Sequence, residues 1–220
     1  MDQTPNSALD VIVVGAGFAG LCALIRLRQR GLSVLALEAA SDVGGTWFFN
    51  CYPGAQCDAA SIDYSFSFDA TLDREWEWSE RFARQPELLR YLRHVAERHD
   101  VRRYIRFNTR VVAASWNEGA SEWIVGTHRV LDPEVEAIHA ARNDVTVMES
   151  AESILRARFI VFATGSHSLP KPVDVPGAAS FLGTSLRTSC WPRGEAGQGV
   201  VPGPPDSCDR DRVVRRTCGA

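Results

Sequence analysis

Asp10-Val-Ile-Val-Val-Gly-Ala-Gly-Phe-Ala-Gly20 is the stretch of sequence that decides the fold. It places Gly15, Gly17 and Gly20 between a short β-branched run and an amphipathic helical pattern. The first glycine permits a tight turn, the second lets phosphates approach the backbone, and the third lets the helix pack closely on the strand. The stretch therefore predicts a strand, a turn and a helix whose N-terminus accepts an anion.

The residues that follow extend this pattern into a β-α-β unit over residues 9–40. Leu21, Leu24 and Ile25 share one face of the expected helix, and Gly31 stands where that helix should end. A second apolar run leads to Glu38. A carboxylate at this place accepts hydrogen bonds from ribose hydroxyls and repels a 2′-phosphate, so we expect FAD or NAD in this first site.

The bulk properties are those of an ordinary globular protein. The chain has 220 residues, 45% of them hydrophobic and 23% charged, and a formal net charge of −3, which does not suggest a nucleic-acid partner. The sequence contains no apolar run of membrane-spanning length and no secretory leader, so we expect a cytoplasmic protein. Its six cysteines match no zinc spacing, and we expect reduced thiols and no metal site.

Beyond residue 40 the patterns alternate between helix and strand. Trp76, Trp78 and Phe82 have a spacing compatible with a helix over residues 70–83, and a second helix is expected over 86–99. We further expect a strand at 104–107, strands at 111–116 and 122–127 joined by a turn, a short helix at 134–142, a hairpin of 144–149 with 154–158, and a buried parallel strand at 159–165.

Several blocks, taken together, resemble one protein family. They are Gly15-Ala-Gly-Phe-Ala-Gly20, Gly44-Gly-Thr-Trp-Phe-Phe-Asn50, Tyr52-Pro-Gly-Ala-Gln-Cys-Asp58, Tyr64-Ser-Phe-Ser-Phe68, Glu75-Trp-Glu-Trp78, Gln85-Pro-Glu-Leu-Leu-Arg-Tyr91 and Ala163-Thr-Gly165, followed by Phe181, Gly183 and Trp191-Pro192. In this order they make the chain resemble the class B flavoprotein monooxygenases, and the Baeyer–Villiger monooxygenases most closely, from about Val11 to Pro192.

The resemblance implies an α/β fold: a Rossmann-like FAD-binding domain with a parallel sheet, helices and a small antiparallel β-meander, incomplete relative to a family with two dinucleotide domains. It divides the chain into a disordered N-terminus at 1–8, an FAD-binding domain at 9–168, a linker toward an absent NADP domain at 169–192, and a non-homologous tail at 193–220. The tail is rich in Gly, Pro and Arg, so we expect it to be disordered and to result from a frameshift.

The resemblance also implies the chemistry. FAD is the cofactor, NADPH its reductant, and O2 the oxidant of a small-molecule ketone, or of an amine or a sulfide in related enzymes. The residues implied to bind the cofactors share the matching blocks: Gly15, Ala16, Gly17, Phe18, Ala19, Gly20, Glu38, Gly45, Thr46, Trp47, Gln56, Cys57, Asp58, Tyr64, Val111, Ala163, Thr164 and Gly165. Asp58 is also implied to act in catalysis, by orienting an arginine of the second domain.

Three departures from the family pattern bear on this expectation. Arg187 stands where the family has a histidine, and Gln56 and Cys51 replace residues that are commonly arginine. The sequence also holds no second dinucleotide fingerprint, so we expect a truncated FAD-binding portion. A non-catalytic FAD-binding fragment is the alternative, and a flavin disulfide reductase is disfavoured because Trp47 follows Thr46 where that class has a cysteine.

Overall fold

The computed structural model describes residues 8–130 and 152–167, with short pieces at 175–177 and 180–182 and the single residues 186, 188 and 191. Several expectations fall outside these residues. They are the helix at 134–142, the strand at 144–149, Gly183 and Arg187 of the family fingerprint, and the tail at 193–220. The expected N-terminal segment and linker also lie largely outside, so their extents stay predictions.

The β-α-β unit is confirmed. It consists of strand β1 (Leu9–Val14), helix α1 (Phe18–Gln29) and strand β2 (Val34–Leu37), and β1 pairs in parallel with β2. The helix buries the face that was expected, and it ends before Gly31, whose φ is +79°. Burying each large aliphatic side chain of this face contributes about 1.5–3 kcal/mol, so packing rather than helix propensity holds α1 in place.

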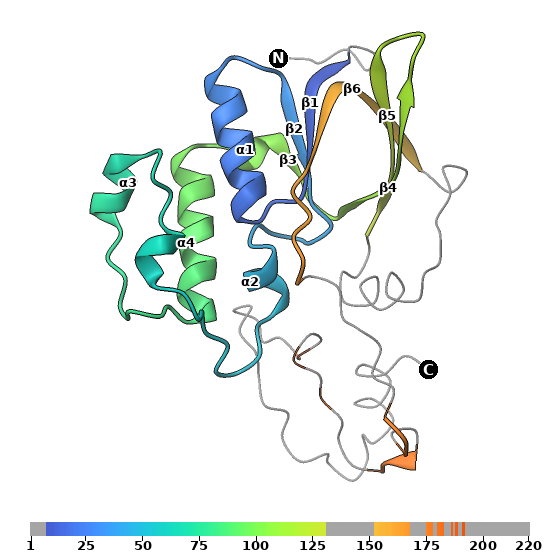
Figure 1. Ribbon diagram of the computed structural model, residues 1–220. Helices are drawn as coiled ribbons and strands as arrows, with labels where there is room; N and C mark the ends of the chain where they lie inside the picture. Colours follow the sequence, from blue (N-terminus) through green and yellow to red (C-terminus); the bar gives the residue numbers. More distant parts are fainter. Residues whose placement is uncertain are drawn as a thin grey trace.

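One six-stranded mixed sheet runs through the molecule in the order β3-β2-β1-β6-β5-β4 (Figure 1). The remaining strands are β3 (Ile105–Arg106), β4 (Thr109–Asn117), β5 (Glu122–Arg129) and β6 (Ser153–Phe162). The first four strands of the order run parallel, whereas β6, β5 and β4 form an antiparallel meander. The parallel sheet and the meander that the resemblance implied are thus both present.

Strand β6 joins the two parts of the sheet. Its residue Ala157 pairs with Trp123 of β5 on one edge and with Leu9 of β1 on the other. Residues 154–158, expected as half of a hairpin with 144–149, are therefore the first half of this long strand. The second half was expected to be buried, which is wrong, because Phe159 and Phe162 are each 59% exposed.

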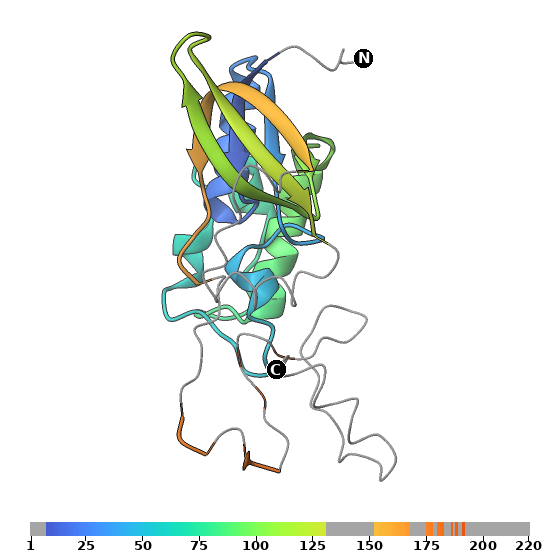
Figure 2. The same cartoon turned by 90° about the vertical axis from the view of Figure 1, so that its right-hand side faces the viewer.

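Two apolar layers cover the sheet. Val11 and Val13 of β1 belong to one apolar layer together with residues of α1 and α4 (Gln85–Arg98). Both helices lie on one side of the sheet (Figure 1). Ile12 and Val14 point to the opposite face, where they pack with Val125 of the meander. Figure 2 looks onto this second face, with the β4–β5–β6 meander in front of the parallel strands. Strand alternation explains why one apolar run serves both layers.

Shorter elements connect β2 to α4. They are α2 (Thr46–Phe49), the 3₁₀ turn η1 (Ser61–Tyr64) and α3 (Ala70–Glu75), and a second 3₁₀ turn, η2 (Arg102–Tyr104), precedes β3. The helix expected over 70–83 therefore stops at Glu75. Trp76 has extended dihedrals, and its ring and that of Trp78 pack on Tyr91 of α4, so tertiary contact overrides the local periodicity.

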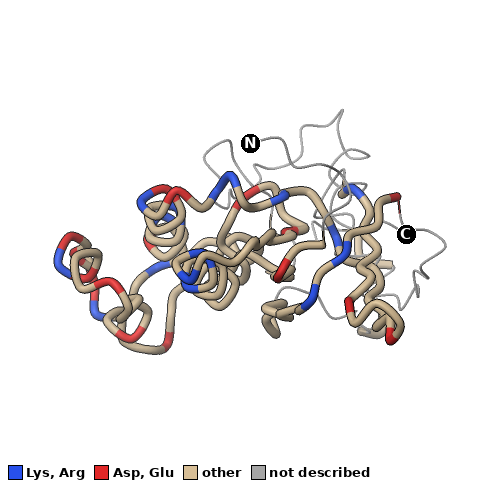
Figure 3. The backbone as a smooth tube through the Cα atoms, turned by 90° about the horizontal axis from the view of Figure 1, so that it is seen from above, with Lys and Arg blue, Asp and Glu red and all other residues tan. Residues whose placement is uncertain are grey.

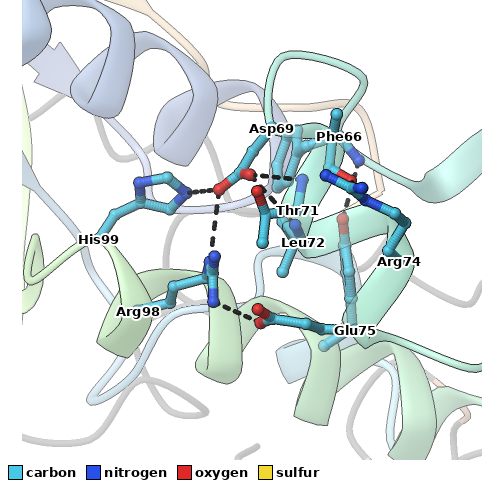
Figure 4. A network of polar contacts seen from close by, with 10 residues as sticks. Phe66, Asp69, Thr71, Leu72, Arg74, Glu75, Arg98 and His99 are labelled. Atoms are coloured by element: carbon cyan, nitrogen blue, oxygen red, sulfur yellow. Dashed lines mark hydrogen bonds and ion pairs between the residues drawn. The ribbon is translucent and has the colours of Figure 1, made fainter.

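A polar network ties α3 to the end of α4 (Figure 4). Asp69 Oδ1 accepts hydrogen bonds from the backbone N–H groups of Thr71 and Leu72 at 3.0 and 3.1 Å, which caps α3. Asp69 Oδ2 accepts from Arg98 Nε at 3.3 Å and lies 3.2 Å from His99 Nε2, without hydrogen-bond geometry to the histidine. These bonds, first that from Leu72, hold the pKa of Asp69 below its usual value.

Charges of both signs are interspersed over the described backbone (Figure 3). Among the described residues, none of the helices is long and apolar enough to cross a membrane. Cys22, Cys51 and Cys57 are free thiols, in line with the expectation of reduced cysteines for these three.

Candidate functional site

A cleft of about 810 Å³ opens where the parallel strands β1, β2 and β6 end and α1 begins. Its volume lies within the range of about 300–1,000 Å³ that is usual for small-molecule sites. The carboxyl ends of parallel strands are also the edge at which open α/β sheets bind ligands. The cleft is therefore the candidate functional site of the described residues.

The glycine loop forms one wall of this cleft and brings the backbone of α1 up to it. Gly15 has a φ of +104°, a conformation that side chains rarely adopt. A methyl group built on Gly20 would lie 2.0 Å from the carbonyl oxygen of Gly15, so only glycine permits this approach of helix and turn. The tight turn and the close packing are both as the sequence indicated.

The N-terminus of α1 presents its backbone N–H groups to the cleft. Gly17 is the N-cap residue. Among the described residues, no side chain caps these N–H groups, and the first turn of α1 contains no acidic residue. Phe18 and Ala19 of the first turn line the cleft with Gly17. A helix end of this kind attracts an anion, through its unpaired N–H groups and its dipole.

Glu38 supplies a buried carboxylate at the end of β2. It is 5% exposed, its Oε2 accepts from Ala16 N at 2.6 Å, and its Oε1 accepts from Ala40 N at 2.8 Å. Burial raises the pKa of this carboxyl, and the N–H groups and the charge of Arg110 act in the opposite direction. The two bonds fix the carboxylate where it can face a ribose.

Aromatic rings form the far end of the cleft. The ring centroids of Phe18 and Tyr64 lie 5.1 Å apart, and those of Trp47 and Tyr64 lie 6.0 Å apart, both edge to face. Buried Gln85 donates to the carbonyl oxygen of Trp47 at 2.6 Å, which holds the backbone of α2 in place. This end offers apolar, planar surface, in contrast to the charged end at Glu38.

Tyr64 remains a neutral phenol over the physiological range. Burial and then the neighbouring Cys57 and Asp58 raise the pKa of Tyr64 to about 12. Asp58 is exposed, and Cys57 is buried with its N–H bonded to the carbonyl of Ala83 at 2.9 Å. Neither residue is among the described residues that line the cleft.

Most of the residues expected to bind the cofactor come together in this cleft. Those that line it are Gly15, Gly17, Phe18, Ala19, Glu38, Gly45, Thr46, Trp47, Tyr64, Val111, Ala163, Thr164 and Gly165. Ala16 lies beside them as a donor to Glu38, and Gly20 packs behind the turn.

Gln56, Cys57 and Asp58 do not line the cleft. Gln56 is exposed, and its Nε2 donates to the carbonyl oxygen of Phe82 at 2.6 Å. The backbone of this segment is bonded to residues 83 and 84, which holds it outside the cavity. The nicotinamide-facing role of these residues and the catalytic role of Asp58 therefore stay predictions.

Sequence reasoning missed several polar residues of the lining, namely Asp63, Ser65, Thr109, Arg110 and His167. Arg110 and Asp63 are direct neighbours of Val111 and Tyr64, so the signal was adjacency to residues already chosen. His167 is brought near α2 by a hydrogen bond from Asn50 Nδ2 to its carbonyl oxygen at 3.1 Å, a contact that the sequence does not indicate. Across the described part of the chain, His, Cys, Asp and Glu side chains form no cluster that could hold a metal.

The fold and the cleft define a Rossmann-like dinucleotide-binding domain. A family model described as an NAD(P)-binding Rossmann-like domain matches residues 13–94. Among curated proteins, the chain is 38% identical over 191 residues to 2-oxo-Δ3-4,5,5-trimethylcyclopentenylacetyl-CoA monooxygenase of Pseudomonas putida. It is 36% identical over 193 residues to a Baeyer–Villiger monooxygenase of Pseudooceanicola batsensis. Each match covers 87% of this chain and 31% of the relative.

Solved structures agree with these relatives. A steroid monooxygenase bound to NADP superposes with a TM-score of 0.71 at 45% identity, over 84% of this chain and 32% of the other. The OTEMO complex with FAD and NADP superposes with a TM-score of 0.71 at 38% identity, over 87% and 32%. The matched residues are therefore Baeyer–Villiger monooxygenase-like in sequence and fold, and the chain spans about 31% of the length of the curated relatives.

Proposed function

We propose that residues 9–168 form an FAD-binding domain whose cleft holds the cofactor along its length. The pyrophosphate lies at the N-terminus of α1, and the adenosine ribose lies at Glu38. The observation that carries this proposal is the uncapped start of α1, which opens on an 810 Å³ cleft with a buried carboxylate at the end of the next strand. Such a pairing of anion site and ribose acceptor suits a dinucleotide.

The two ends of the cleft fit the two ends of FAD. Val111 and Arg110 of β4 lie near the Glu38 end, where the adenosine belongs. Trp47, Tyr64 and Phe18 offer the apolar surface that a flavin ring requires. Tyr64 keeps its hydroxyl proton at this end of the cleft, so it places no negative charge beside the flavin ring.

When bound, FAD supplies hydride acceptance and the reaction of its reduced form with O2. The residues of this chain hold the cofactor and keep water from one side of it. Gln85 of α4 donates to the carbonyl oxygen of Trp47 in α2, and Gly44 N donates to Ala16 O at 3.1 Å. Hydrogen bonds therefore connect the segment around α2 to α4 on one side and to the glycine loop on the other.

For the whole protein, we propose an NADPH-dependent flavin monooxygenase that acts on a small ketone, with amines or sulfides as further substrates. The similarity to monooxygenases along 87% of the chain supports this reaction class. An anaerobic titration with NADPH tests whether this chain carries that activity by itself: bleaching of the bound flavin would support it, because reduction by NADPH needs a nicotinamide site. A flavin that stays oxidised under excess NADPH would contradict monooxygenase activity of this chain, support the alternative of a non-catalytic FAD-binding fragment, and leave FAD binding intact.

Cofactor binding is tested with a matched pair of ligands. FAD and FMN share the isoalloxazine ring, but FMN lacks the adenosine and the pyrophosphate. We expect the purified chain to retain FAD after gel filtration and to release FMN, because the α1 and Glu38 contacts exist only with FAD. Equal retention of the two flavins would show that the ring alone binds, and the proposed orientation would be wrong.

A further inference from the structure

Aromatic ring contacts continue from the cleft into the core of the protein. Trp47, Tyr64 and Phe18 all line the cleft, and the ring of Tyr64 contacts the rings of the other two. The Phe18 ring also stacks on that of Tyr91 of α4, with a centroid distance of 6.2 Å and an interplanar angle of 24°. The aromatic end of the cleft is thus connected to a ring that is fully buried in the core.

Two tryptophans of the segment between α3 and α4 complete this series of contacts. The ring centroid of Tyr91 lies 5.0 Å from that of Trp78 and 5.2 Å from that of Trp76. The two indoles contact each other edge to face at 5.8 Å, and both are half-buried, so each is partly in contact with water. We call the six connected rings the aromatic path: Trp47, Tyr64, Phe18, Tyr91, Trp78 and Trp76.

The rings of the aromatic path differ in how easily they lose an electron. Indole and phenol rings are oxidised far more readily than the phenyl ring of Phe18, which can only bridge them. A phenol loses an electron readily only where its proton has an acceptor. The Tyr91 hydroxyl accepts a hydrogen bond from Phe66 N at 2.8 Å, and its own proton has no acceptor among the described residues. The oxidisable ends of the path are therefore Trp47 at the cleft and the pair Trp76 and Trp78.

The outer pair of tryptophans suits a positive charge that is later neutralised. Trp76 Nε1 has no hydrogen-bond partner, and Trp78 Nε1 donates to the hydroxyl oxygen of Ser65 at 3.0 Å. Among the described residues, neither nitrogen is thus bonded to a base, so an oxidised indole keeps its proton and a single electron restores it. Water at the half-buried rings also stabilises the charge better than the interior does, whereas a bound cofactor would cover Trp47.

Building on the proposed FAD site, we propose that the aromatic path carries oxidising equivalents from the flavin end of the cleft to Trp76 and Trp78. An oxidant at the flavin end, such as light-excited flavin, takes one electron from Trp47, and Trp47 takes one electron from the outer pair through the bridging rings. No covalent bond forms or breaks, and no proton leaves a ring. A soluble one-electron reductant such as ascorbate then supplies the missing electron at the surface. The path thereby protects the lining of the cleft from oxidation, a function beyond cofactor binding.

The test follows the FAD-loaded chain after a laser pulse in the absence of oxygen. Removing both outer indoles, in Trp76→Phe with Trp78→Phe, should leave the quenching of flavin fluorescence unchanged, because Trp47 and Tyr64 still line the cleft. The charge then stays beside the flavin and recombines quickly. Transient absorption should therefore show at least threefold less long-lived oxidised tryptophan than in the wild type, whose signal ascorbate should shorten.

Trp116 and Trp123 of the meander supply a matched control. Their rings also contact each other edge to face, at 5.6 Å, and no ring contact joins them to the aromatic path among the described residues. Trp116→Phe with Trp123→Phe should keep the wild-type yield. A measurement on the wild type alone makes the test independent of the variants' folding: a nitroso spin trap, located by peptide mapping after illumination, should label Trp76 or Trp78 rather than Trp116, although Trp116 is 41% exposed.

The outcomes separate the two proposals. If FAD binds but the two double variants give equal yields, or the trap labels Trp116 as strongly as the outer pair, the aromatic path is wrong and the FAD site stands. If a fluorescence titration shows that the wild-type chain does not bind FAD, the FAD site itself is wrong, and the path falls with it because its oxidant is absent.

Discussion

Replacing Gly20 by alanine should damage the cleft more than any other single methyl group added to α1. The new Cβ would lie 2.0 Å from the carbonyl oxygen of Gly15 and 2.7 Å from its carbonyl carbon. Ordinary contact begins at 3.4 Å, so helix and turn must separate by about 1.4 Å. Both neighbours are backbone atoms, and no rotamer change can relieve the clash.

This separation has two consequences. Overpacking of this kind destabilises a protein by roughly 1–3 kcal/mol. It also moves the N–H groups of the first turn of α1 away from the proposed pyrophosphate position. Because each 1.4 kcal/mol is about a tenfold change in affinity, a loss of the same size as the strain would make Gly20→Ala bind FAD roughly 5- to 140-fold more weakly.

Gly31→Ala at the other end of α1 is the matched control. Gly31 has a φ of +79° but open space around its Cβ position, so alanine there adds backbone strain of about 1–2 kcal/mol without a clash. Urea unfolding and quenching of FAD fluorescence measure both variants. The reasoning fails if Gly20→Ala and Gly31→Ala lose the same stability and both keep wild-type FAD affinity.

Three further predictions concern charge and exposure. Burial raises the pKa of Glu38 above 4.5, so the stability that depends on the protonated carboxyl is fully present below pH 4.5 and is lost as the pH rises through the raised pKa. The free energy of unfolding of Glu38→Gln, measured against pH, should not show this loss. Asp69, with its lowered pKa, stabilises above pH 3.8 and loses this contribution as the pH falls. Asp69→Ala should be destabilised by about 1 kcal/mol at pH 7 through its lost cap, and should be less acid-sensitive than the wild type in thermal melts. Phe159 is 59% exposed beside an edge of β6 that, beyond Ala157, has no strand partner among the described residues. Phe159→Lys should therefore reduce self-association in light scattering, whereas Ile62→Lys, at a similarly exposed site of η1, should not.

The fold could be predicted where local patterns carry it. The strand, glycine turn and helix of the β-α-β unit each depend on a pattern of consecutive residues. The structure places β1, α1 and β2 as expected. The helix over 70–83 could not be delimited in this way. Its end at Glu75 depends on contacts of Trp76 and Trp78 with Tyr91, which lies on another helix.

The exposure of β6 could not be predicted from its local sequence either. The run Phe159-Ile-Val-Phe162 has the continuous apolar character of a covered parallel strand, and it does pair in parallel with β1. Whether its faces are covered depends on what packs there. Phe159 and Phe162 remain exposed, whereas Ile160 and Val161 between them pack against the two apolar layers.

The site was predictable to the extent that motif residues share one edge of the sheet. The glycine loop, Glu38 and Ala163–Gly165 follow three strands that end together, so their meeting in the cleft follows from parallel topology. Arg110 comes from an antiparallel strand, and it reaches the cleft because Thr109 N, at the start of β4, donates to the carbonyl oxygen of Glu38 at 2.8 Å. No spacing rule in the sequence encodes that contact.

The central claim is that the first turn of α1 binds the pyrophosphate of FAD. The most direct measurement records backbone amide resonances of the ¹⁵N-labelled chain during titrations with FAD and with riboflavin. The account predicts that FAD shifts the amides of Gly17, Phe18 and Ala19 most strongly and that riboflavin, which has no phosphate, leaves them in place. Saturating FAD that shifts the aromatic end of the cleft but not these three amides would contradict it.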